Sequence, residues 1–176
     1  MRQYLISLLV VLASIAVPAN LAQSPPPGAH DPWQPLAFLI GTWGAETGGG
    51  TAAAKVIGIY SFAPELNNHI LARHSGNASC KAPADFDCEH TDLLYLYLEG
   101  NAIKAIYLDN EGHVIHYDVT TPTPTSAVLL SDPAAPGPQF RLVYERKDSV
   151  LSGKFQMRMP GQSEFSSYLE WSGSKK

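Results

Sequence analysis

Apolar and polar positions alternate over many short stretches of this chain, and little helical spacing is seen after residue 40. Runs of β-branched and aromatic residues lie between clusters of Gly, Pro, Asn and Asp, a pattern typical of half-buried β-strands. The pattern predicts strands at residues 42–47, 55–62, 69–75, 93–98, 102–108, 114–119, 125–130, 140–146, 150–158 and 165–171.

Several joints between these runs are short and have the chemistry of hairpin loops. Residues 99–101, 109–112 and 147–149 combine Gly, Asn, Asp or Ser, so consecutive strands are expected to pair antiparallel. Many antiparallel strands without covering helices must stack as two sheets or close on themselves, and closure removes the sheet edges. We therefore predict an all-β, up-and-down antiparallel β-barrel of about ten strands. A sandwich is the alternative, because residues 76–92 and 131–139 are long enough for a crossover.

The phase of the alternation is ambiguous in the middle of the chain. In the run 102–108, Ile103 and Tyr107 lie on one face, whereas Ile106 and Leu108 lie on the other. Because both faces carry apolar residues, the pattern does not decide which one points inward.

A compact apolar segment precedes the first predicted strand. Residues 36–40 have apolar side chains at helical spacing, which predicts a short N-terminal helical turn, and Gly41-Thr42-Trp43-Gly44 follows directly. The glycines allow a close backbone approach, and Trp43 supplies a large apolar side chain with one donor. We expect Trp43 to plug one end of the barrel.

The N-terminus has the features of a targeting segment. Arg2 precedes an apolar run at residues 5–17, and small residues at 17–22 offer a cleavage site. This predicts a signal peptide at residues 1–22, a Pro-rich linker at 23–35 and the barrel domain at 36–176. The apolar run is shorter than a spanning helix requires, so we expect no membrane span after cleavage and a secreted or periplasmic location.

Composition fits a single domain with an ordinary core. The chain has 176 residues, of which 45% are hydrophobic, and a formal charge of −4. Without Arg2 the mature chain has 11 basic and 16 acidic side chains, a charge of about −5. No basic patch is evident, so nucleic acid is not an expected partner, and a monomer or weak dimer is expected.

Cys80 and Cys88 are the only cysteines, and they flank the polar loop at residues 81–87. In an exported protein, two such cysteines favour a disulfide over a metal or redox role. We predict that a Cys80–Cys88 disulfide closes this loop.

Several motifs resemble known barrel families. The Gly-x-Trp of residues 41–43, after a short helical turn, resembles the entry strand of the calycins, which include lipocalins, fatty-acid-binding proteins and nitrobindins. The opening at 36–44, the pair at 73–74 and the segments 90–93, 109–117 and 140–144 are similar to the secreted DUF1579-type family. The resemblance covers most of the mature chain and implies a calycin barrel, but it says little about function.

The nitrobindin resemblance also raises the question of a cofactor. Nitrobindins hold haem through a histidine near the C-terminal strands, whereas no histidine follows His116 here and Tyr168 lies in the last predicted strand. We therefore expect no haem and no other cofactor.

Polar residues within otherwise apolar strands are the candidates for chemistry. A barrel of about ten strands is wide enough to hold a cavity. An arginine in such a cavity requires an anion, which is either on a ligand or on an internal carboxylate that joins strands. The candidate internal carboxylates are Asp92, Asp109, Glu145 and Glu170. We predict a small apolar or amphipathic ligand in the interior, with an anionic group as one option. The candidate ligand-binding residues are Arg73, Tyr107, His116, Arg141, Tyr144 and Tyr168.

Signals for metal binding and nucleophilic catalysis are weak. His113 and His116 point to opposite faces of a strand, so a shared metal ion is not expected. The chain has no Gly-x-Ser-x-Gly motif. Two alternatives to a binding protein remain: an enzyme with acid–base or isomerase chemistry through Arg73, His90 and His116, and a structural or interaction module with a filled interior.

Overall fold

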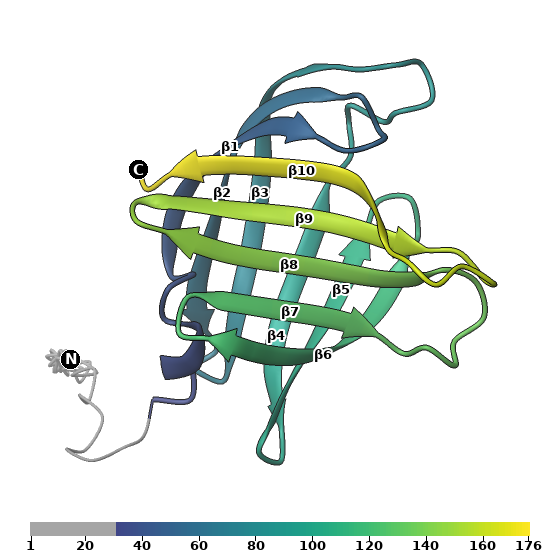
Figure 1. Cartoon of the computed structure of the whole chain (residues 1–176). Helices are drawn as coiled ribbons and strands as arrows, with labels where there is room; N and C mark the ends of the chain where they lie inside the picture. Colours follow the sequence, from purple (N-terminus) through teal and green to yellow (C-terminus); the bar gives the residue numbers. More distant parts are fainter. Residues whose placement is uncertain (1–30) are drawn as a thin grey trace, which may run out of the picture. The chain divides into compact units, whose positions relative to one another are not determined.

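The computed structural model describes residues 31–176, which form a closed barrel of ten antiparallel strands (Figure 1). Each strand pairs with its neighbour in the chain, and β10 pairs with β1 to close the sheet. The predicted up-and-down barrel is therefore confirmed, and the sandwich is excluded. The strands are β1 (Gly41–Gly49), β2 (Lys55–Glu65), β3 (Ile70–Lys81), β4 (Asp92–Glu99), β5 (Ala102–Asp109), β6 (Val114–Thr123), β7 (Ser126–Ser131), β8 (Gln139–Lys147), β9 (Val150–Arg158) and β10 (Ser166–Ser174).

The predicted signal peptide at residues 1–22 and most of the predicted linker lie outside the described residues. Within residues 31–176, no helix is long and apolar enough to cross a bilayer.

Strand alternation decides what the barrel encloses. In the β5–β6 hairpin, Ala105 and Tyr117 are directly opposite each other and buried, so the face that carries them points inward. Lys104 and Asp118, also opposite each other, form an ion pair on the outer face. Closure of the barrel thus resolves the phase that the sequence left ambiguous, because only one face of each strand is enclosed.

One end of the barrel is filled with large apolar side chains. The 3-10 helix η1 (Gln34–Leu36) follows Trp33, and both Trp33 and Leu36 are fully buried. Trp43 is buried beside them, and its indole Nε1 donates to the carbonyl of Leu39 (2.7 Å). Trp43 therefore has the position expected of a plug. Trp33, from the segment expected to be linker, packs in the same cluster.

The disulfide between Cys80 and Cys88 is present, with a Cα–Cα distance of 5.7 Å. Cys80 lies near the end of β3, and Cys88 lies in the loop that leads to β4. The predicted pairing is confirmed. It ties residues 81–87 to the end of the barrel opposite the tryptophan plug, where the functional site is found.

Candidate functional site

A cavity of about 1000 Å³ lies inside the barrel and extends to its open end. It is lined by the ends of β1, β3, β5 and β9, by the starts of β2, β4, β6, β8 and β10, and by the loop at 85–91. Because the opposite end is filled by the tryptophan plug, the cavity is a pocket with one mouth. Its volume is at the upper end of the range for small-molecule sites.

One wall of the cavity is aromatic and comes from β8, β9 and β10. The rings of Phe140 and Phe155 are stacked with centroids 5.7 Å apart, and Tyr168 meets Phe155 edge to face. Trp171 completes this wall over Gly153, where any side chain would overlap the indole. These faces suit the apolar or aromatic body of a ligand.

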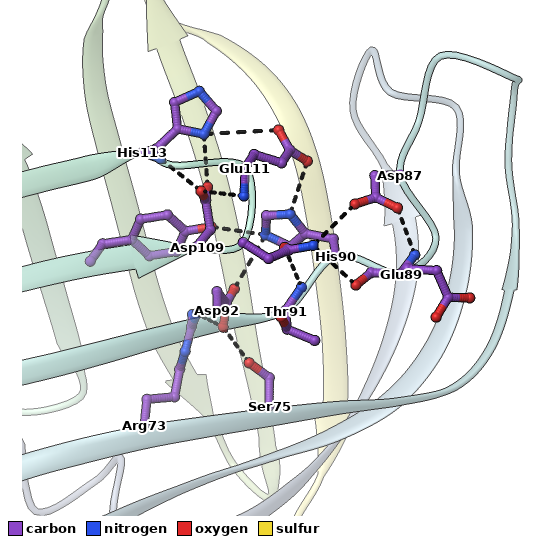
Figure 2. Close-up of polar contacts among 12 residues, drawn as sticks. Arg73, Ser75, Asp87, Glu89, His90, Thr91, Asp92, Asp109, Glu111 and His113 are labelled. Atoms are coloured by element: carbon purple, nitrogen blue, oxygen red, sulfur yellow. Dashed lines mark hydrogen bonds and ion pairs between the residues drawn. The ribbon is translucent and has the colours of Figure 1, made fainter.

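The opposite wall is polar and centred on Arg73 of β3 (Figure 2). Its Nη2 lies 2.6 Å from Asp92 Oδ1, and its Nη1 donates to the Tyr144 hydroxyl (2.6 Å). Ser75 also donates to Asp92. Burial disfavours the charged form of Arg73, but Tyr144 and Asp92 outweigh this effect and raise its pKa. The arginine is therefore charged, and it is neutralised within the protein.

Three more tyrosines surround Arg73. Burial raises the pKa of Tyr60, Tyr107 and Tyr117, and the positive charge of Arg73 opposes that effect at each of them. Among the described residues, neither the Tyr117 hydroxyl nor Arg73 Nε has a hydrogen-bond partner. The inner end of the cavity thus presents uncharged phenols and unused polar atoms.

The mouth is built from two loops that are joined by hydrogen bonds (Figure 2). His90 bonds to the Tyr107 hydroxyl through Nε2 (2.9 Å) and to Glu111 through Nδ1 (3.1 Å). The Asn110 side chain accepts from the backbone N–H of Thr91 (2.8 Å). Through these bonds the disulfide-closed loop is held against the β5–β6 turn.

Asp109 organises the turn itself. Its carboxylate accepts from the backbone N–H groups of Glu111 (3.1 Å) and His113 (2.8 Å), and His113 Nδ1 lies 2.8 Å from its second oxygen. Burial tends to raise the pKa of Asp109, but the hydrogen bonds from His113 outweigh that tendency and lower it. Asp109 therefore stays ionised at the mouth.

Two groups at the mouth are close enough to share a divalent cation. The ligand atoms within each group lie no more than 4.8 Å apart. One group is Asp87, His90 and Glu111, and the other is Asp109, Glu111 and His113. Neither group was predicted, because only histidines were compared as shared metal ligands, whereas each group combines one histidine with two carboxylates. Hydrogen bonds to protein groups already account for the positions of these side chains, and we assign no divalent metal ion to them.

The structure divides the predicted ligand-binding residues into two sets. Arg73, Tyr107 and Tyr168 line the cavity, and Tyr144 is buried behind Arg73. Arg141 lies on the outer face of β8, where it donates to Gln156 (2.8 Å) and covers the ring of Phe165. It lies there because Phe140 and Leu142, its neighbours in the strand, point inward.

His116 is likewise on the outside, because Ile115 and Tyr117 take the inward positions of β6. The alternative enzymatic set is therefore not assembled: Arg73 and His90 both approach Asp92, but His116 does not share their face. Tyr168, the residue of the last strand considered in the question of haem, lies on the cavity wall, and the expectation of no haem stays a prediction.

Asp92 was one of the carboxylates expected to pair with the arginines, and it does bind Arg73. The aromatic pair Phe140 and Phe155 and the acidic mouth were not predicted. The aromatic pair was detectable from strand alternation; the mouth was not, because it joins loops that are distant in sequence. No protein-family model matches the chain, and no curated protein is significantly similar to it. The resemblance to DUF1579-type and nitrobindin-like proteins therefore stays a prediction.

The lowered pKa of Asp92 has a consequence for stability. Burial opposes its charged form, but the charge of Arg73 and the hydrogen bond from Ser75 more than compensate. The contribution of Asp92 is complete above its usual value of 3.8 and is lost as the pH falls towards the lower folded value. We expect the unfolding free energy of the wild type to decrease more steeply below pH 3.8 than that of Asp92→Asn, as measured by urea unfolding at successive pH values. Asp118→Asn changes a carboxylate on the outer face, and its unfolding free energy should decrease with falling pH as steeply as that of the wild type. An equally steep decrease in all three proteins would contradict this prediction.

Proposed function

We propose that this chain is an exported binding protein that holds a small apolar or amphipathic molecule inside its barrel. The observation that carries the proposal is the cavity of about 1000 Å³ between an aromatic wall and a polar wall. A barrel that served only as a structural module would be expected to fill this space with side chains. The plug at the other end makes the mouth the route of entry.

Export is supported by two features of the chain. The predicted signal peptide at residues 1–22 precedes the domain, and the Cys80–Cys88 disulfide suits an oxidising compartment. The mature protein should then begin at Asn20 or Gln23. Intact-mass analysis of the exported protein tests this, and a mass that retains residues 1–22 would contradict it.

Native mass spectrometry of detergent-free protein tests the binding function. We expect a small organic molecule to leave on denaturation, and we expect the emptied protein to bind the uncharged dye Nile red. Met157→Trp, on the cavity wall, should reduce both signals because the indole occupies ligand space. Lys154→Trp, on the outer face of the same strand, is the matched control and should bind as the wild type does. Absence of any bound molecule together with failure to bind Nile red would refute the proposal.

A further inference from the structure

The negative charge of the protein is concentrated at the cavity. Residues 31–176 contain 16 acidic and 11 basic side chains. Six of the acidic side chains but only one basic side chain line the cavity, which leaves ten of each elsewhere. The whole excess of five negative charges is therefore at this site. The six carboxylates are Asp85, Asp87, Glu89, Asp92, Asp109 and Glu111.

The single lining cation, Arg73, does not attract an anion from outside. Its charge is balanced by Asp92 at 2.6 Å, so the remaining five carboxylates are uncompensated. Among the described residues, none of these five forms a salt bridge with Lys or Arg; Glu111 and Asp109 contact His90 and His113 instead. A cleft lined by charge of one sign concentrates counter-ions and repels ions of its own sign.

The acidic loops and the aromatic wall face the same opening. Burial raises the pKa of Tyr168, and the negative charges of Glu111 and Asp85 raise it further. Both carboxylates are therefore close enough to β10 to act on a group at the edge of the aromatic wall. A cation at the mouth would lie between carboxylates and aromatic rings, the combination that recognises organic ammonium groups.

We propose that the ligand is an organic cation, with an apolar body between Phe140, Phe155 and Trp171 and an ammonium group among the carboxylates of the mouth, chiefly Asp87 and Glu111. This inference rests on the proposed binding function and narrows its ligand class. It also replaces the anionic option of the sequence analysis, because Arg73 is already neutralised.

The contribution of the charge to binding can be separated from that of the apolar body with three molecules that share one alkyl chain but differ in head group. These are decylamine, decanol and decanoate. By calorimetry at about pH 8, where unperturbed imidazoles are neutral, decylamine should bind about tenfold more tightly than decanol, and decanoate should bind more weakly than both. The preference should shrink as NaCl is raised from about 0.02 M to about 0.5 M, because salt screens the mouth. Decanoate binding as tightly as decylamine would overturn the inference but leave the binding function intact. If none of the three binds, the binding function itself fails.

A pair of double variants tests where the cation is held. Asp87→Asn with Glu111→Gln should remove most of the preference for decylamine over decanol, measured as the ratio of the two dissociation constants for the same variant. Asp118→Asn with Glu65→Gln makes the same change in net charge on the outer face and should keep the preference. If the two double variants show equal preferences, the ammonium group is not held at the mouth and the inference is wrong.

Discussion

An Arg73→Met variant should lose about 3–5 kcal/mol of unfolding free energy, because it leaves the carboxylate of Asp92 buried without its cation. The side chains of Arg73 and Asp92 are only 6% and 17% exposed, so water does not replace the lost partner. The Tyr144 hydroxyl, which is fully buried, loses its donor at the same time. Urea unfolding followed by tryptophan fluorescence measures the change.

Two further variants give this prediction its controls. Arg141→Met removes the same type of side chain from the outer face and should cost only about 1 kcal/mol, because it breaks one partly buried hydrogen bond and leaves no carboxylate without its cation. The double variant Arg73→Met with Asp92→Asn should lose about 0.5–3 kcal/mol less unfolding free energy than the sum of the losses of the two single variants, because the two side chains interact directly. Additive losses, or equal losses for Arg73→Met and Arg141→Met, would show that Arg73 does not have the role described here.

The second large effect is expected at the seam where β10 closes on β1. A Cβ atom at Gly173 would overlap the backbone carbonyl of Gly44, and a carbonyl in a strand cannot turn away as a flexible side chain can. Gly173→Ala should therefore force the two strands apart and destabilise the barrel by about 3 kcal/mol.

Gly76→Ala is the matched control for the seam, because a Cβ atom there would meet no atom within 4 Å. Its effect on stability should be small, because the added methyl group meets no other atom. Thermal unfolding of the two variants beside the wild type makes the comparison. A melting temperature of Gly173→Ala equal to that of the wild type would contradict the close packing of β1 against β10.

Much of the fold was predictable because its causes are local. Short hairpin joints predicted antiparallel neighbours, and a ten-strand meander without helices predicted closure. The boundaries of β3 were harder to predict: Gly76, Asn77 and Ser79 are polar and exposed and were assigned to a loop. They are in a strand because the backbone of β2 pairs with them along its whole length, and a backbone ladder does not require apolar side chains.

The candidate site was predicted less completely. Arg73, Tyr107 and Tyr168 were identified as polar residues in apolar strands, and all three line the cavity. The same criterion selected Arg141 and His116, which lie outside, because residue type does not reveal the phase of a strand. For Arg141 the phase could have been inferred, since Phe140 and Leu142 alternate with it; that information was in the sequence but was not used.

By itself, the sequence determined most of the strands, the antiparallel pairing of consecutive strands, the place of Trp43 and the disulfide, because each depends on residues that are neighbours or nearly so in the chain. Only the tertiary structure decided that Arg73 meets Tyr144, 71 residues away, and that carboxylates from two separate loops surround one mouth. The physical reason is closure: it selects one face of every strand for the interior and brings loops from distant hairpins to the same end of the barrel.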